Sequence, residues 1–188
     1  TQIYIDRWGG GDAYFTYRDP NDSDTIYYES QYGGLRRQSV SADRSKSIRP
    51  QQLGNEPLRF AWMTPYFPSR YESKHLYVGA QHVLKSENRG DAWRVISPDL
   101  TKGPDSPNLL YRAITALAES PHVEGALLAG TDNGNLWLTY DDGANWKQID
   151  HELPDLQVSR IEFSPHDSQR LFVTMTGMRY DNFKPFVF

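Results

Sequence analysis

The sequence predicts an all-β fold, a partial β-propeller of about three and a half four-stranded, antiparallel blades. Short hydrophobic strands recur after turns that contain proline. Aligning Ile26, Leu76, Leu127 and Leu171 gives spacings of 50, 51 and 44 residues. Periods of roughly 40–50 residues that carry only strand signals are typical of propeller blades. The 14 glycines, 12 prolines and 13% aromatic residues also favour short strands and many turns.

The first two repeats each read as four short strands. In the first repeat, residues 12–50, the strands are AYFTYR, TIYYESQ, GLRRQSV and KSIRP. In the second repeat, residues 58–98, they are AWMTPYF, HLYVGA, HVLKSE and WRVIS. The strands rich in aromatic and β-branched residues fit a half-buried sheet surface.

The third repeat, residues 111–150, is the clearest. Its strands are ITALAES (114–120), ALLAGT (126–131), NLWLTY (135–140) and WKQI (146–149). Between the second and third of these, Asn133-Gly134 predicts a type I′ hairpin turn, because glycine accepts a positive φ.

The fourth repeat, residues 157–188, contains VSRIEFS and RLFVTM and then FKPFVF, with no fourth strand. We therefore expect residues 1–188 to be part of one propeller domain. We also expect them not to close a ring alone, unless Ile3–Ile5 pairs with Phe183–Phe188. If the ring is open, either more polypeptide or another chain would cover the exposed edges.

Composition narrows the classes of function. The net charge of −4 gives no general attraction to nucleic acid or to an anionic membrane surface. No apolar run approaches the roughly 18 residues that span a bilayer, so we expect no direct membrane insertion. The absence of cysteine excludes disulfides and thiolate chemistry. We expect no cofactor and no metal, because the five histidines lack metal-ligand spacing.

A turn motif recurs between the third and fourth strands. One copy is Thr139-x-Asp141-x-Gly143-x-x-Trp146, and the other is Ser86-x-Asn88-x-Gly90-x-x-Trp93. The short acceptor side chain can take hydrogen bonds from backbone N–H groups of its own turn, and the glycine permits a tight backbone. The tryptophan buries a large apolar area, so we expect it to be largely buried between sheets. These residue types indicate scaffold rather than a catalytic pair.

The motif resembles the Asp-box of BNR-repeat propellers, found in sialidases, sortilin-type propellers and many bacterial secreted proteins. In sialidases the box lies away from the catalytic face. From GGGDAYFTYRDPNDSDTIYYESQ to AGTDNGNLWLTYDDGANWKQI, nearly the whole chain is similar to large bacterial proteins labelled as BNR-repeat or sortilin-N-terminal-like glycosyl hydrolases. The resemblance implies a β-propeller, usually of six or more blades, and an extracellular, periplasmic or cell-envelope location. Likeness of fold does not establish hydrolase chemistry.

Five residues are candidates for a site. Asp12, after a run of glycines that lets backbone approach a ligand, and Asp132, beside the Asn-Gly turn, are the candidate catalytic acids. Their structural alternatives are a connection between blades and an ordinary hairpin. Trp8, Arg59 and Trp62 are candidate ligand-binding residues. Trp62 would either stack on a sugar ring or pack in the core.

Three functions remain open. A non-catalytic propeller scaffold or protein-interaction module of an exported or envelope-associated assembly is favoured, because every repeated motif is structural in character. Its partners would be other protein chains, with a glycan as the alternative. A xyloglucanase-like glycoside hydrolase needs two carboxyls about 5–10 Å apart across an open groove. A sortilin-like peptide- or glycan-binding receptor domain needs a pocket without such a pair.

Overall fold

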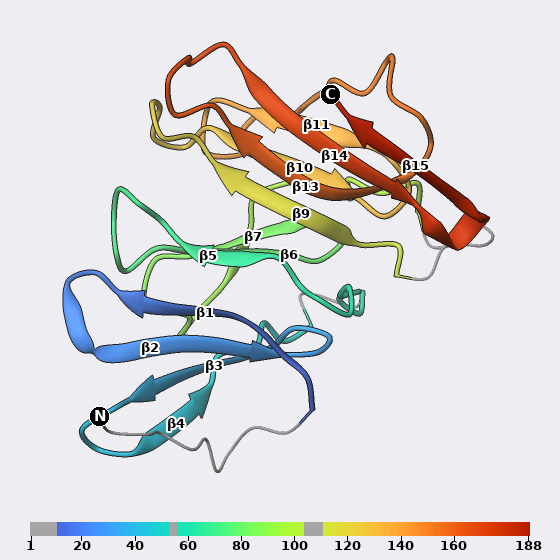
Figure 1. Ribbon diagram of the computed structural model, residues 1–188. Helices are drawn as coiled ribbons and strands as arrows, with labels where there is room; N and C mark the ends of the chain where they lie inside the picture. The colour runs from blue at the N-terminus through green and yellow to red at the C-terminus, as the bar shows by residue number, and fades with distance from the viewer. Residues whose placement is uncertain (1–10, 53–55, 104–110) are drawn as a thin grey trace.

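The computed structural model describes residues 11–52, 56–103 and 111–188, which form four antiparallel sheets (Figure 1). Within these residues the only helical segment is the short 3-10 turn η1 (Met178–Tyr180), so no helix in them has the length and apolarity to cross a membrane. The fold is all-β, as predicted.

In every sheet the strands lie side by side in chain order. The first sheet contains β1 (Ala13–Asp19), β2 (Asp22–Ser30), β3 (Gly34–Ser39) and β4 (Arg44–Ser47). The second contains β5 (Tyr66–Pro68), β6 (Leu76–Gly79), β7 (Val83–Ser86) and β8 (Arg94–Val95). The third contains β9 (Ile114–Glu119), β10 (Leu127–Thr131), β11 (Leu136–Thr139) and β12 (Lys147–Gln148). The fourth contains β13 (Gln157–Phe163), β14 (Leu171–Gly177) and β15 (Asn182–Val187).

The four strands that follow a proline-containing turn, β2, β6, β10 and β14, are each the second strand of a different sheet. This confirms the prediction that they occupy equivalent places in consecutive sheets. The alternating burial along β2 also has the period of two residues expected for a strand with one packed face.

The sheets are arranged around an axis that the first strands surround. β1 contacts β5, β6 contacts β9, and β9 contacts β13, so the sheets follow one another from blue to red in Figure 1. The row of sheets curves, so that the fourth sheet comes back to the first. The Arg160 guanidinium on β13 lies 5.9 Å from the centroid of the Phe15 ring on β1. A cavity of about 80 Å³ on the axis is lined by residues of all four first strands, including Tyr17, Tyr66 and Thr115. This arrangement is that of propeller blades.

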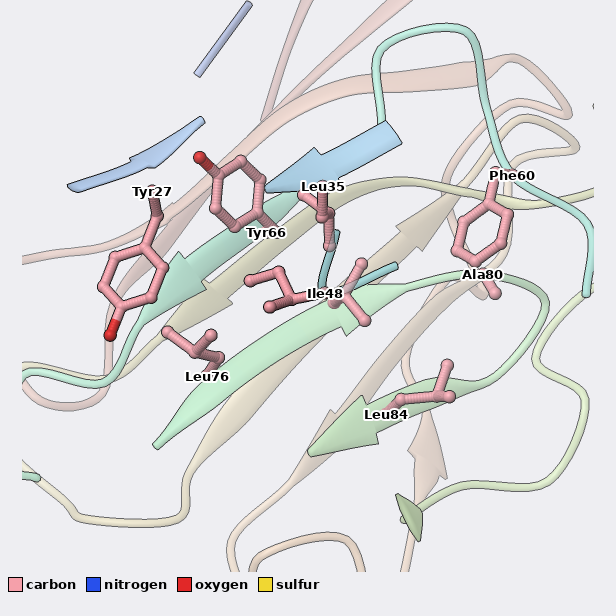
Figure 2. Close-up of a cluster of buried hydrophobic side chains, with 9 residues drawn as sticks. Tyr27, Leu35, Ile48, Phe60, Tyr66, Leu76, Ala80 and Leu84 are labelled. Carbon is pink, nitrogen blue, oxygen red and sulfur yellow. The ribbon is translucent and has the colours of Figure 1, made fainter. Parts of the chain in front are cut away.

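Each pair of successive sheets buries an apolar cluster. Figure 2 shows the first one, in which Tyr27 and Leu35 of the first sheet pack against Tyr66, Leu76 and Leu84 of the second. The second cluster joins the second and third sheets through Tyr77, Val83, Ile114 and Leu127. The third joins the third and fourth sheets through Leu128, Leu136, Val158 and Val173. Burial of apolar area is therefore concentrated between sheets.

The recurring turn motif has one hydrogen-bond pattern in both copies. Thr139 Oγ1 accepts the Gly143 N–H at 3.2 Å and donates to Asp141 Oδ1 at 2.8 Å, and Asp141 Oδ1 accepts the Asn145 N–H at 2.8 Å. The Asn145 hydrogen bonds, followed by that of Thr139, lower the pKa of the Asp141 carboxyl. The same three bonds, at 2.8, 3.0 and 2.8 Å, join the equivalent residues of the other copy, Ser86, Asn88, Gly90 and Ala92.

The tryptophan of each motif reaches back to the preceding sheet. Trp93 Nε1 donates to the Ile48 carbonyl and Trp146 Nε1 to the Ile96 carbonyl, both at 2.8 Å. The prediction that both rings are largely buried was too strong. Each is only partly buried, because it lies beside the fourth strand, at the edge of the sheet farthest from the axis.

The predicted type I′ turn at Asn133-Gly134 is wrong. A type I′ turn needs a positive φ at both of its central residues. Gly134 has a φ of 90°, but the φ of Asn133 is not positive. The Gly134 N–H donates to the Thr131 carbonyl at 3.4 Å, and the Thr131 N–H donates to the Asn135 carbonyl at 3.0 Å. The loop is therefore a three-residue hairpin in which glycine follows a type I turn. The pairing of residues 3–5 with residues 183–188, which would contradict the expectation that the ring does not close, lies partly outside the described residues.

Candidate functional site

A cleft of about 290 Å³ lies at the end of the axis where the first strands begin. We call it the central-face cleft. It is lined by residues from all four sheets and the segments before them: Tyr14, Ala61, Trp62, Met63, Tyr111, Thr115, Gln157, Ser159 and Arg179. The connections between sheets and the loops between second and third strands converge here, because both leave the sheets at this end.

Aromatic rings form a wall at the central-face cleft, in which Trp62 and Tyr111 line the cleft and Tyr32 lies beside them. The Tyr32 ring meets the Trp62 ring edge-on, with centroids 4.9 Å apart, and lies 6.4 Å from the Tyr111 ring. The Arg179 guanidinium lies 4.9 Å from the Tyr111 centroid, and its Nη2 donates to the Tyr111 hydroxyl at 3.3 Å. Tyr32 and Trp62 are 45% and 36% exposed, so a ligand can reach both rings.

The backbone holds this wall in place. The Tyr32 N–H donates to the Trp62 carbonyl at 3.0 Å, which ties the β2–β3 loop to the segment before β5. Tyr32 has a φ of 57°, an unusual conformation for a residue with a Cβ. The neighbouring Gly33, with φ of 70°, packs so closely on the Phe60 ring that a Cβ there would be 2.8 Å from it.

Asp12 is exposed and bonds to Tyr14, a residue that lines the cleft. Its N–H donates to Gln31 Oε1 at 2.9 Å, and its carboxylate accepts the Tyr14 hydroxyl at 3.4 Å. Partial burial, and after it the Asp12 charge, raise the pKa of the Tyr14 phenol. Asp12 is thus an available carboxylate beside a tyrosine that lines the cleft.

Asp132 has a different environment. It is buried, and its carboxylate accepts three backbone N–H groups: those of Tyr111 at 2.9 Å, Arg112 at 2.8 Å and Ala113 at 3.1 Å. These bonds fix the start of β9 and thereby the place of Tyr111 in the cleft wall. The geometry gives Asp132 a positioning role toward the cleft.

Arg59 is directed into the protein. Its guanidinium donates to the Arg112 carbonyl at 3.0 Å, to Glu56 at 3.0 Å and to Asp99 at 2.6 Å. Burial of Asp99 acts to raise its pKa, but the hydrogen bonds from Thr101 and Arg59 outweigh it, so the pKa lies below its ordinary value. Of the candidate ligand-binding residues, Trp62 therefore lies in the cleft and Arg59 supports the segments around it. Trp8 falls outside the described residues.

Sequence reasoning missed Tyr14, Tyr32, Tyr111, Gln157 and Arg179. A positional signal was present for three of them, because Tyr14, Tyr111 and Gln157 lie at or just before the predicted first strand of a repeat. Tyr32 and Arg179 come from loops between second and third strands, and only the packing of sheets brings these loops together. In the described residues, no group of three or more His, Asp and Glu side chains is placed to hold a metal ion.

The chain matches no protein-family model and no curated protein sequence. It is similar to several solved structures. The GH74 xyloglucanase from Xanthomonas campestris has a TM-score of 0.62 at 20% identity, over 89% of this chain and 28% of that protein. An ancestral GH74 enzyme has a TM-score of 0.60 at 14% identity, over 88% of this chain and 22% of that one.

A similar structure of another kind is the extracellular domain of a protein described as a one-component system from B. thetaiotaomicron. Its TM-score is 0.60 at 17% identity, over 92% of this chain and 22% of that one. This chain thus spans between 22% and 28% of the length of these three structures. At such identities the likeness shows the fold alone, and that fold is the β-propeller.

Proposed function

We propose that residues 1–188 belong to a non-catalytic propeller domain that binds another protein chain at the central-face cleft, as part of an exported or envelope-associated assembly. The observation that carries the proposal is the exposed wall formed by Tyr32, Trp62 and Tyr111 with Arg179. Tyrosine, tryptophan and arginine are the side chains that dominate the energetics of protein interfaces.

The acids of this face support binding rather than hydrolysis. Asp132 is occupied by three backbone amides, and Asp99 and Glu56 are occupied by Arg59. Of these four acids, all within the described residues, Asp12 remains available, but a glycosidase of the usual type requires a second carboxyl across the bond to be cleaved. The likeness to an extracellular domain agrees with an exported location.

A glycan is the second candidate ligand, and the Trp62 ring favours it. An aromatic face that is partly exposed, beside polar groups such as Gln157 and Arg179, can stack on a sugar ring while the polar groups hydrogen-bond its hydroxyls. The GH74 likeness makes xyloglucan the first polysaccharide to test.

The test compares three proteins: the unchanged chain, Trp62→Ala, and Tyr140→Ala as a control that removes an exposed aromatic ring outside the cleft. Peptides selected from a displayed library on the unchanged chain should bind Trp62→Ala at least about tenfold more weakly and Tyr140→Ala unchanged. Equal binding to all three proteins would remove the cleft as the site.

Xyloglucan oligosaccharides provide the second arm of the test. Calorimetry would show whether they bind at Trp62, and a reducing-sugar assay would show whether they are cleaved. Binding without cleavage, lost in Trp62→Ala, would favour the glycan ligand. Cleavage that Asp12→Asn abolishes would establish a hydrolase and refute the non-catalytic proposal.

A further inference from the structure

A polar cleft lies between the first and second sheets, at the end opposite the central-face cleft, where β2 begins and β7 ends. We call it the basic cleft. It has a volume of about 360 Å³ and is lined by Thr25, Arg37, Lys74, Asn88, Arg89 and Asp91. Both sheets that form its walls have all four of their strands within the described residues.

The next interface, between the second and third sheets, shows how the equivalent place is filled there. Asp142 accepts the Tyr77 hydroxyl at 3.1 Å, the Lys85 ammonium at 2.8 Å and the Arg94 guanidinium at 3.1 Å. Its backbone has a φ of 56°, and its N–H donates to the Gly125 carbonyl at 3.0 Å. A carboxylate of the chain itself therefore pairs with the cations at this interface.

The basic cleft has cations at the same two positions of the turn. Arg89 is the counterpart of Asp142, because both follow the acceptor residue of the turn motif and Arg89 has a matching φ of 60°. The Arg89 N–H donates to the Lys74 carbonyl at 2.8 Å, so Lys74 is the counterpart of Gly125. The first interface thus carries an arginine in place of the acid and a lysine in place of the glycine.

Two acids of the chain balance only part of this charge. Asp91 pairs with Arg37 at 3.1 Å and with Lys46 at 2.6 Å. The buried Asp19 pairs with Nε of Arg89 at 3.0 Å. Together with the lysine that meets the Arg89 N–H, these groups are four cations and two acids, and they leave the basic cleft with two net positive charges.

The strongest donors of the basic cleft are open to a ligand. Among the described residues, neither Nη of Arg89 nor Nζ of Lys74 has an acceptor within hydrogen-bond distance. The Arg89 side chain is 30% exposed and Lys74 is exposed, so solutes reach both. Two further acids nearby are engaged, because Asp22 accepts the Thr25 hydroxyl at 2.8 Å and Glu72 accepts the Lys74 N–H at 3.2 Å.

We propose that the basic cleft binds a sulfate or phosphate group, carried as a monoester by a larger ligand, between Arg89 and Lys74. The bound group supplies from outside the negative charge that Asp142 supplies at the next interface. A guanidinium presents paired N–H groups that match two oxygens of such an anion, and the ammonium adds a point charge. A carboxylate has fewer oxygens and a single charge, so it would satisfy fewer of these donors.

Nuclear magnetic resonance titrations of the ¹⁵N-labelled chain test the proposal, with inorganic sulfate and inorganic phosphate as probes at constant ionic strength. The expected result is saturable shifts of the amide signals of residues 72–75 and 88–91. The dissociation constant should rise at least about threefold in Lys74→Gln, which removes one charge at contact distance. Lys147→Gln removes the same charge from an exposed site on β12 and should bind as the unchanged chain does. Acetate should bind at least about threefold more weakly than sulfate.

Three results would overturn the proposal: shifts that do not saturate, equal weakening in the two variants, or acetate binding as tight as that of sulfate. Each would show a general attraction of anions in place of a site. A sulfated disaccharide and a sugar phosphate then distinguish the two sources of the group. The ester that binds more tightly than its inorganic ion identifies the source, and no gain for either would refute the monoester. These outcomes do not depend on what the central-face cleft binds.

Discussion

Replacing Glu29 by glutamine should stabilise the protein at alkaline pH. Glu29 lies on β2, opposite Leu35 in the pairing with β3, and is 1% exposed. Neither carboxyl oxygen has a well-formed hydrogen bond to the described residues. Burial raises the pKa of this carboxyl to about 8, and the nearby Thr64 N–H counteracts only part of the rise. The charged form is therefore strongly disfavoured in the folded state.

The sign and size of the effect follow from proton linkage. Between the ordinary pKa of 4.5 and the folded-state pKa of about 8, the folded protein binds more protons at Glu29 than the unfolded chain does. Stability therefore falls as pH rises through that window. At 1.36 kcal/mol per pKa unit, the loss is about 1 kcal/mol by pH 5 and nearly 5 kcal/mol by pH 9. Glu29→Gln has no charge to bury and escapes this loss.

Urea melts of the two proteins at pH 5 and pH 9 would measure the effect. The free energy of unfolding of Glu29→Gln minus that of the unchanged chain should grow by about 4 kcal/mol between these two pH values. Burial also raises the pKa of Glu119, but Glu119 is present in both proteins and cancels. A difference that stays constant within about 1 kcal/mol would show that Glu29 is hydrated or paired, and the reasoning would fail.

Three further predictions concern the scaffold. Trp146→Ala should cost about 3 kcal/mol in a urea melt, through lost packing and the lost bond to the Ile96 carbonyl, and a cost below about 1 kcal/mol would contradict this. Gly143→Ala should cost more than Gly103→Ala. Both glycines have positive φ, but an added Cβ collides with the Ile96 carbonyl at the first site and meets nothing within 4 Å at the second, so equal costs in melts would refute the collision. Asp132→Ala should speed hydrogen exchange of the three amides that it accepts while leaving exchange in the first sheet unchanged, and unaltered exchange of those amides would show that it does not fix the start of β9.

The order of the strands was predictable because its signals are local. The proline turns directly precede the short hydrophobic strands at 25–30, 75–80, 126–131 and 170–175, and each of these strands pairs with its neighbours in the chain. The Asn133-Gly134 turn was mistaken because loop length, which sets turn type, depends on the register fixed by Thr131 and Asn135.

The candidate site was less predictable for a related reason. Its wall combines Tyr32, Trp62, Tyr111 and Arg179, which belong to four different sheets or their connections and carry no shared motif. The burial of Glu29 was equally hidden. Its charge is typical of a solvent-facing position, but Glu29 lies on the same face of β2 as the buried Tyr27.

The backward reach of the motif tryptophans gives the protein a direction of assembly. Trp93 and Trp146 each bond to a carbonyl of the sheet that precedes them in the chain. On a ribosome, each newly emerged sheet would find its acceptor already made, so the domain can be built sheet by sheet in the order of synthesis without waiting for distant segments. A chain permuted to begin at the third sheet would synthesise Trp146 before its acceptor, and should refold as the natural order does but assemble more slowly during translation.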